Sequence, residues 1–416
     1  MWADQLLDIL SLRWLSERGI FVDVDGDAHT IGRRVRQIRY ARSKSLRVVA
    51  GLAGMSKSKL SLIERGELAL DSRSDIVALA NALQVAPSEL TKVDVPAPGN
   101  GESDAVTAKI RCAMQGALVG APDGRVCPIE QLSVRVDAVG RLKQRCANGE
   151  LGAMLPELIG DLYASIAAGR NDAQLLRLAV ELHTNGTQTY LYVMRASDDL
   201  RLVAASLAND AAERLDDPVS LGVAAFGFHN VLLASGSFTL ADGIVRRAGV
   251  TPGVDVELAG MLALATSLTA AAGKRPADAE AALDYAADLA VRTGEGNRFF
   301  LSFGPTNVTL WRMAAVLEAK DYERTVALAE TVAPERIQAS ARRAGYWMSY
   351  GRALARLRGR QKQAVMALRK AELISPNEVQ RHPFVREVLG ELLVRSRRDA
   401  LGVELRGMAY RAGLPM

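Results

Sequence analysis

The sequence predicts an all-α protein in two parts, a small basic helical domain near the N-terminus and a larger body of paired helices. Residues 45–66 contain two short helical segments joined by a tight turn at Gly54. After residue 104, Ala, Leu, Val, Glu and Arg dominate and strand-like alternation is scarce. The helical segments there end at Gly or Pro and recur in pairs about every forty residues, which is a period of stacked helical hairpins.

These patterns divide the chain into four segments. Residues 1–29 are expected to form an amphipathic helix and a polar connector, and residues 30–92 to form the basic domain. Pro and Gly interrupt residues 93–104, which we interpret as a linker. Residues 105–416 are expected to form the repeat body. A chain of 416 residues is long enough for this second core, and a hydrophobic fraction of 49% is ordinary for a folded protein.

Residues 45–66 have the spacing of a helix-turn-helix. Ser45 and Ser56 are placed to cap the two helices, because a serine hydroxyl accepts a hydrogen bond from an unpaired main-chain N–H. Gly54 allows the sharp turn between the helices. The expected inward-facing residues are Val48, Val49 and Leu52 on the first helix and Leu60 and Ile63 on the second. In this motif the second helix lies in the major groove of DNA.

The basic charge of the chain is concentrated in this domain. Between Ile31 and Lys92 there are twelve Lys or Arg and five Asp or Glu, a net charge of +7, whereas the whole chain carries +5. Such a local excess is typical of a DNA-binding surface. The candidates for phosphate contacts are Arg33, Arg34, Arg36, Arg39, Arg42 and Lys44, and those for base contacts are Lys57, Ser58, Lys59 and Ser61. A solvated face of a small bundle is the alternative for each residue.

Residues 31–90 resemble the XRE family of helix-turn-helix domains, which includes Cro and the phage repressors. The matching residues are Ile31-Gly32, Arg36, Ser45-Leu46-Arg47, Ala50, Gly54, Ser56, the run from Leu60 to Gly66, Ile76, Leu79, Ala80, Leu83, Val85 and Leu90. The resemblance implies a five-helix DNA-binding domain. Many members begin the first helix of the pair with a Gln that touches the DNA backbone, where this chain has Leu46 followed by Arg47. The predicted DNA-binding residues are Arg36, Arg47, Ser56, Lys57, Ser58, Lys59 and Ser61.

The body is predicted to be a solenoid of helical hairpins. The expected helices are Leu175 to Ser197, Leu200 to Leu215, Val219 to Leu233, Val256 to Ala271, Ala277 to Thr293, Asn307 to Ala319, Tyr322 to Val332, Arg342 to Leu357, and Gln361 to Ile374. The clearest repeat, Trp347 to Pro376, resembles the tetratricopeptide repeat. Small residues such as Gly351 let its two helices approach closely.

Two segments of the body resemble actinobacterial regulators that join an XRE head to a tetratricopeptide-like body. These segments are Phe303-Gly304-Pro305-Thr306-Asn307-Val308 and His382-Pro383-Phe384-Val385-Arg386-Glu387. In such regulators a His often stands where this chain has Trp311. The chain also resembles the peptide-sensing quorum regulators in its domain order. The concave surface of such a solenoid commonly holds a peptide or another extended ligand.

Asn307, Trp311 and Arg352 are the candidate ligand-binding residues of the body. The amide of Asn307 suits a ligand main chain, and Trp311 lies one helical turn later as an apolar wall. The repeat register places Arg352 on the concave side. The simpler interpretations are that Thr306 and Asn307, which follow Pro305, begin and cap a helix, and that Trp311 belongs to the core.

No sequence pattern indicates catalysis, a metal site or a cofactor, and the protein is predicted not to be an enzyme. Cys112, Cys127 and Cys146 include no close pair, and the histidines have no His or Cys at ligand spacing. No Gly-rich loop precedes a Lys-Ser or Lys-Thr pair. No segment has the ~20 apolar residues of a membrane span, and the N-terminus lacks the pattern of a signal peptide. We therefore expect a cytoplasmic protein associated with the nucleoid.

The sequence thus predicts a bacterial transcription regulator that binds double-stranded DNA sequence-specifically. A homodimer is expected to bind half-sites about one helical turn apart. The body is expected to mediate dimerisation and, as a further hypothesis, to bind a peptide or small-molecule effector. The alternative is a repeat scaffold that binds a protein partner and uses the head only as a tether to DNA. An enzyme hidden in the body is a third, less favoured interpretation.

Overall fold

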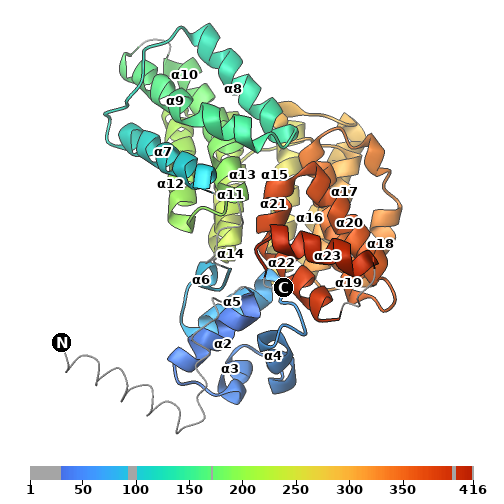
Figure 1. Cartoon of the computed structure of the whole chain (residues 1–416). Coiled ribbons are helices and arrows are strands. Elements are labelled where there is room, and N and C mark those ends of the chain that lie inside the picture. Colours follow the sequence, from blue (N-terminus) through green and yellow to red (C-terminus); the bar gives the residue numbers. More distant parts are fainter. Residues whose placement is uncertain (1–29, 92–100, 170–171, 396–399, 415–416) are drawn as a thin grey trace, which may run out of the picture.

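The structure is a computed structural model that describes residues 30–91, 101–169, 172–395 and 400–414. Every regular element within these ranges is helical, so the predicted all-α class is confirmed. A small domain lies beneath a larger helical body (Figure 1). We call residues 30–91 the head and residues 101–414 the body. The helix predicted within residues 1–29 lies outside the described residues.

The head contains five helices, as the sequence predicts. They are α2 (Ile31–Ala41), α3 (Leu46–Leu52), α4 (Lys57–Glu64), α5 (Arg73–Leu83) and α6 (Pro87–Thr91). Both predicted caps are confirmed, because Ser45 Oγ accepts from Val48 N and Ser56 Oγ accepts from Lys59 N. Gly54 has a φ of +65°, a left-handed conformation that glycine adopts without steric cost, so the predicted turn is confirmed as well.

Helices α2 and α4 approach too closely for a side chain at Gly32. A Cβ at this position would lie 1.9 Å from the main-chain oxygen of Ile63. Val35, Leu60 and Leu79 are fully buried in the core around this contact. The close approach fixes α4 against the rest of the head.

The predicted apolar stripe of α3 is wrong at two positions. Val48 is 49% exposed and Leu52 is 63% exposed, so neither belongs to the core. Helix α3 has only seven residues and packs on α4 and α5 through one side, which carries Val49 and Ala50.

The body consists of helices α7 to α23. Their bounds are α7 (Gly101–Leu118), α8 (Ile129–Gln144), α9 (Asn148–Ala167), α10 (Asp172–Glu181), α11 (Gln188–Val193), α12 (Asp198–Leu215), α13 (Pro218–Ala234), α14 (Phe238–Ala248), α15 (Val256–Ala272), α16 (Pro276–Thr293), α17 (Pro305–Glu318), α18 (Tyr322–Glu330), α19 (Ser340–Arg356), α20 (Gln361–Ile374), α21 (Pro376–Arg381), α22 (Pro383–Val394) and α23 (Ala400–Arg411). Short 3-10 turns occupy Arg298–Phe300 and Pro334–Arg336.

Consecutive helices of the body pack as hairpins, most extensively α15 with α16 and α19 with α20. The predicted stack of helical hairpins is therefore confirmed. The pair α19 and α20 is the repeat that resembles a tetratricopeptide motif. A Cβ on Gly351 would lie 2.8 Å from the side chain of Leu368 and 3.2 Å from the main-chain oxygen of Ala364, so this glycine permits the close approach.

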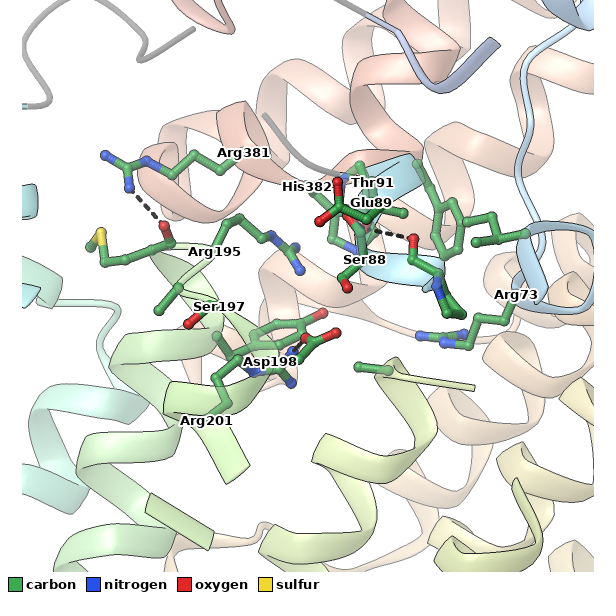
Figure 2. A pocket seen from close by; sticks show the side chains of 18 of the residues that line it. Arg73, Ser88, Glu89, Thr91, Arg195, Ser197, Asp198, Arg201, Arg381 and His382 are labelled. Atoms are coloured by element: carbon green, nitrogen blue, oxygen red, sulfur yellow. Dashed lines mark hydrogen bonds and ion pairs between the residues drawn. The ribbon is translucent and has the colours of Figure 1, made fainter. Parts of the chain in front are cut away.

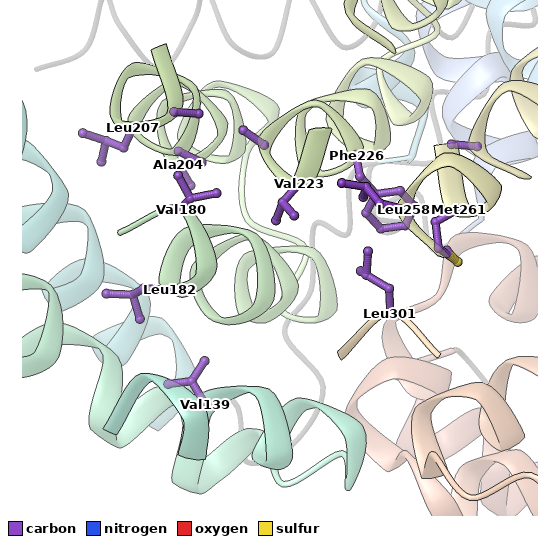
Figure 3. Close-up of a cluster of buried hydrophobic side chains, with 14 of the residues drawn as sticks. Val139, Val180, Leu182, Ala204, Leu207, Val223, Phe226, Leu258, Met261 and Leu301 are labelled. Atoms are coloured by element: carbon purple, nitrogen blue, oxygen red, sulfur yellow. The ribbon is translucent and has the colours of Figure 1, made fainter. Parts of the chain in front are cut away.

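The main core of the body runs through the hairpins between α7 and α17. Figure 3 shows part of it, with Val180 of α10, Val223 of α13 and Leu258 of α15 among its buried side chains. Phe303 is fully buried and fits against Gly260, where a Cβ would lie 2.1 Å from the ring. The segment that joins α16 to α17 is therefore part of the core.

The structure differs from the prediction in two segments. The stretch from Leu175 to Ser197 is helical without a break only as far as Val193, and a π-helical turn, Leu182–Thr187, lies within it between α10 and α11. All six residues of this turn are buried, and His183 bonds both Thr187 Oγ1 at 3.2 Å and Tyr163 Oη at 3.1 Å. The predicted linker 93–104 overlaps the first residues of α7, which begins at Gly101.

Candidate nucleic-acid interface and its attachment to the body

The first turn of α4 presents polar side chains to solvent. Lys57 and Ser58 are exposed and have no side-chain partner among the described residues. Ser56 is exposed as well, and its hydroxyl caps the helix by accepting from Lys59 N at 3.1 Å. Lys59 is half-buried and its Nζ lies 3.0 Å from Asp75 Oδ2. Ser61 Oγ accepts from Arg65 Nη1 at 2.7 Å.

Arg36 and Arg47 are exposed on α2 and α3, next to this helix in the head. Arg47 has no partner in the described part of the chain. The guanidinium of Arg36 lies 5.6 Å from the ring centroid of Tyr40. The neighbouring Arg39, and after it Arg36, lower the pKa of Tyr40. The DNA contacts of all seven predicted residues remain predictions. Among them, Lys57, Ser58 and Arg47 are exposed and have no side-chain partner within the described ranges.

Arg39 is wrong as a candidate for phosphate contact. Its Nε and Nη2 each donate to a carboxylate oxygen of Glu64 at 2.7 Å, and both side chains are buried. The hydrogen bond to Glu64 outweighs the effect of burial and raises the pKa of Arg39. This bidentate pair ties α2 to the end of α4. The role of Arg39 is therefore to hold α4 in place.

Arg42 and Lys44 are bound within the head. Lys44 Nζ donates to the carbonyl oxygen of Ala82 at 2.7 Å, and Arg42 Nη2 donates to that of Gln84 at 3.3 Å. Both acceptors lie at the C-terminal end of α5, where main-chain carbonyls lack helical partners. These two cations thus stabilise the end of a helix.

The opposite side of the head is bound to α19 and α22 through buried charges. Arg352 Nε donates to Asp71 Oδ1 at 2.8 Å, and Glu391 Oε2 accepts from Ala69 N at 2.9 Å. Glu387 Oε1 accepts from Ile31 N at 2.5 Å. Phe384 from α22 is part of the head's own apolar core. Head and body therefore share buried ion pairs and an apolar contact.

Helix α17 holds the start of α5. Glu318 Oε1 accepts from Arg73 N at 2.5 Å and from Ser74 N at 3.2 Å, and its Oε2 lies 2.9 Å from Arg73 Nη1. A carboxylate at this position satisfies N–H groups that have no helical partner and complements the helix dipole. The body thus caps a helix of the head.

The carboxylate of Asp75 connects the body to α4. Asp75 Oδ2 accepts from Lys320 Nζ at 2.7 Å and from Lys59 Nζ at 3.0 Å. Burial by itself raises the pKa of Asp75, but Lys320 and Lys59 together outweigh it and hold the pKa below its ordinary value. Helix α17 ends at Glu318, and Lys320 comes two residues later, after the C-cap residue Ala319. The position of Lys59 therefore depends on a residue of the body.

Trp311 lines two cavities, of about 330 Å³ and about 250 Å³, whose walls come from the body and from Arg73 of the head. Its Nε1 is buried and has no hydrogen-bond partner in the described part of the chain, and the same holds for Nε2 of Gln188, which lines the cavity of about 330 Å³. The indole ring is tilted against Phe226 with centroids 6.3 Å apart. Trp311 is thus both a core residue and a cavity wall.

Asn307 is placed differently from the prediction, whereas Arg352 lines a cavity together with Trp311. Asn307 is buried, and its Nδ2 lies 3.4 Å from Met261 Sδ. It is not among the residues that line the two cavities with Trp311. Arg352 lines the smaller cavity but is already bound to Asp71. The expected cap is also wrong, because α17 begins at Pro305 and Glu295 accepts from Thr306 N.

Charged residues from three distant helices meet at the larger cavity. Burial lowers the pKa of Lys143 to about 7, and Lys143 Nζ donates to Asn185 Oδ1 at 2.8 Å. Burial also lowers the pKa of Arg342 to about 10 and raises the pKa of Glu378. They come from α8, α19 and α21, which no local pattern connects. Sequence reasoning missed these residues, as it missed Glu318 and Lys320.

Comparison with known proteins supports the assignment of the head. Residues 30–92 match the family model of a helix-turn-helix domain. No curated protein sequence matches the chain. Among solved structures, Bacillus thuringiensis PlcR in complex with the peptide PapR7 and DNA is similar over 87% of this chain and 99% of that chain, at 14% identity and a TM-score of 0.34. At that TM-score, functional conclusions for this chain rest on its own residues.

The head is therefore a helix-turn-helix domain, the DNA-binding fold of many transcription regulators. Within the described ranges, no helix combines the length and apolar character needed to cross a membrane.

Proposed function

We propose that this protein is a cytoplasmic, sequence-specific transcription regulator whose α4 reads the major groove of DNA and whose body adjusts DNA affinity by binding an effector. The observation that carries the first half is the exposed start of α4. Lys57 and Ser58 project from a helix whose opposite side is fixed in the core by Leu60 and Ile63. Ammonium and hydroxyl groups at such positions match the acceptors and donors on base edges.

Helix α17 supports the second half of the proposal. Trp311, near its middle, faces the cavity of about 330 Å³, and Glu318, at its end, caps α5 of the head. Lys320 follows and shares Asp75 with Lys59 of α4. A ligand at Trp311 therefore touches the helix that holds the head. To change DNA affinity, this ligand must bind one arrangement of head and body better than another.

We also propose a homodimer, because helix-turn-helix proteins commonly read two half-sites about one helical turn apart. Light scattering on the full chain tests this directly. We expect twice the mass of one chain without DNA, and that mass plus the mass of one duplex with DNA. A monomer on DNA that protects a single half-site would contradict the dimer.

The DNA-binding half is tested by mapping bound sites in the genome of the host and then measuring affinity for the recovered operator at fixed salt. Lys57→Ala combined with Ser58→Ala should lower operator affinity about tenfold or more and relax its sequence preference, since each good base contact is worth about 1–3 kcal/mol. Lys274→Ala is the matched control, because it removes an equally exposed charge from the body.

Unchanged affinity and sequence preference in the double variant would contradict base reading by α4.

The effector half is tested by native mass spectrometry of protein purified from its host, with Trp311→Ala as the variant that should lose a retained ligand. If no ligand is retained and host extract leaves DNA affinity unchanged, a scaffold tethered to DNA describes the protein better.

A further inference from the structure

A cavity of about 520 Å³ lies between head and body. Figure 2 shows that its lining comes from both, with Arg73 and Ser88 on the head and Arg195, Arg201 and His382 on the body. Trp311 does not line this cavity, but the cavity adjoins the one of about 330 Å³, because both are lined by Arg73, Tyr192, Arg201, Leu233 and Ala234. It differs from that cavity in the residues of α6 that it adds from the head, such as Ser88.

Two arginines at this cavity have buried donors without acceptors. Nε and Nη2 of Arg195 and Nε of Arg201 are inaccessible to solvent and have no hydrogen-bond partner among the described residues. Both guanidinium groups lie near the ring of Tyr192, at 4.4 Å and 5.3 Å from its centroid. The quadrupole of one ring compensates desolvated cations only in part, because it accepts no hydrogen bond in the plane of the guanidinium.

The carboxylates around the cavity are already engaged or lie in water. Asp198 Oδ1 accepts from Arg201 Nη1 at 3.2 Å, Glu89 lies 3.6 Å from Arg34, and Asp199 is exposed. Burial lowers the pKa of Arg201. The charge of Asp198 acts against this shift, and the charge of Arg195 adds to it. The two arginines thus lack a full set of acceptors within the described chain.

The main chain places Arg195 at this cavity in spite of local strain. Arg195 follows α11 with a φ of 57°, a left-handed conformation that favours glycine. Ala196 N donates to the carbonyl oxygen of Leu191 at 2.9 Å and closes this helix end. In Figure 2 the side chain of Arg195 extends into the cavity, whereas that of Arg381 points away from it.

Nδ1 of His382, which also lines the cavity, is a fourth polar atom that is buried without a partner among the described residues. His382 is 7% exposed and Arg201 is 6% exposed, so neither side chain can satisfy these atoms with bulk water. Buried donors beside a cavity are stabilised by an acceptor that reaches them from it, and an anion satisfies both the hydrogen bonds and the charge of the arginines.

We propose that this cavity binds the carboxylate or phosphate group of a small anionic ligand, with Arg195 and Arg201 as its principal donors. The proposal adds a second ligand site beside the one at Trp311 and rests on the proposed function only for its regulatory meaning. A volume of about 520 Å³ lies within the range of small-molecule sites and leaves room for the rest of the ligand. Because Arg73 begins α5, a bound ligand contacts head and body at once and favours one placement of the head.

The test titrates the full chain with inorganic phosphate and, separately, with succinate, at an ionic strength held constant with sodium chloride. Calorimetric titration and thermal unfolding measure binding. At about ten times its Kd, the anion of the matching class should raise the Tm of the chain by about 1–2 °C over chloride alone. The arm that responds identifies the ligand group as phosphate or carboxylate. No response beyond chloride in either arm would overturn the proposal.

Arg195→Gly is the decisive variant, since glycine relieves the left-handed conformation while the guanidinium is removed. Its Tm without anion should equal or exceed that of the wild type, and its anion affinity should fall at least tenfold. Lys274→Gly is the matched control, because Lys274 also follows a helix with a φ of 58° but is exposed away from the cavity. Its anion affinity should not change.

Arg195→Gln provides a second variant of similar side-chain length, and it should lose anion binding as well. Wild-type anion affinity in both Arg195 variants would overturn the assignment. DNA binding measured without added anion on the same preparations separates this outcome from a failure of the proposed function.

Discussion

On the side of the head that carries α3 and α4, Arg47 and Lys57 are exposed and have no partner in the described part of the chain. On the side that meets the body, Asp71 and Arg73 are bound to Arg352 and Glu318. The same residue types therefore serve two purposes. Unpaired exposed charges are available to a polyanion, whereas paired buried charges fix the orientation of the domain.

Lys59 lies between these two sides. It belongs to α4, yet Asp75, its partner, is shared with Lys320 of the body. A residue of α4 and a residue of the body thus share one carboxylate. The head therefore has one surface with exposed charges that a ligand can reach and another surface whose charges are bound to the body of the same chain. Variants on the two sides should separate stability from DNA binding.

The largest effect is expected for Asp71→Ala. Removing this carboxylate leaves Arg352 and Arg356 without the charge that both face, and breaking a buried pair by removing one partner costs about 3–5 kcal/mol. Urea unfolding measures the loss. Asp288→Ala on α16 is the control, since Asp288 is exposed and should change the free energy of unfolding by less than about 0.5 kcal/mol. A similar small change in both variants would show that the head is not held by these charges.

A smaller, pH-dependent effect is expected for Glu387→Gln. Burial raises the pKa of Glu387 from 4.5 to about 7, against the hydrogen bonds from Ile31 and Leu70. Between these pH values the folded chain keeps a proton that the unfolded chain has released. The stability contributed by Glu387 is therefore full below pH 4.5 and is lost as pH rises through about 7.

Glutamine keeps an acceptor for Ile31 N but does not titrate. The free energy of unfolding of the variant, minus that of the wild type, should therefore rise by roughly 1–3 kcal/mol between pH 4.5 and pH 8. Taking this difference cancels the opposite pH dependence of His183 and His229, whose pKa values are lowered by burial. A difference that stays constant with pH would contradict the role assigned to Glu387.

The two helix caps offer a matched pair of intermediate size. Ser56 Oγ accepts from Lys59 N at 3.1 Å on the DNA side, and Ser72 Oγ accepts from Asp75 N at 3.3 Å on the body side. Each change to Ala should cost about 1 kcal/mol. Ser72→Ala should cost more, because Ser72 is fully buried and also bonds Ser74. Thermal unfolding gives the order, and a larger loss for Ser56→Ala would reverse the comparison.

The smallest effect on stability is expected for Lys57→Ala. Because Lys57 is exposed and unpaired, the free energy of unfolding should stay within about 0.5 kcal/mol of the wild-type value. If Lys57 meets a phosphate or base, the slope of log affinity for DNA against log salt should become shallower by about 1. An unchanged slope would place Lys57 outside the contact.

The local features of the head could be predicted because short-range physics decides them. A serine before a helix accepts from that helix's own N–H groups, and a glycine with a positive φ makes its turn within four residues, so Ser45, Gly54 and Ser56 were assigned correctly. Val48 and Leu52 were not, because the face of a seven-residue helix that is buried depends on what packs on it.

Much less of the site in the body could be predicted. Trp311 was identified and lines a cavity, whereas Asn307 was assigned a cap and ligand role that its buried contact with Met261 does not support. Lys143, Arg342 and Glu378 carry no local signal. They line one cavity only because the packing of the body brings α8, α19 and α21 together.

The sequence by itself therefore determined the helix-turn-helix, its caps and turn, the basic charge of the head, and the stack of hairpins behind it. These follow from interactions between residues a few positions apart and from the composition of each segment. Only the tertiary structure decided that Glu318 caps α5, that Asp75 joins Lys320 to Lys59, and that Arg195 and Arg201 face a cavity beside the head. Glu318 lies 245 positions from Arg73, and a charge has no preferred partner at that separation until packing brings the two together in a buried, low-dielectric contact.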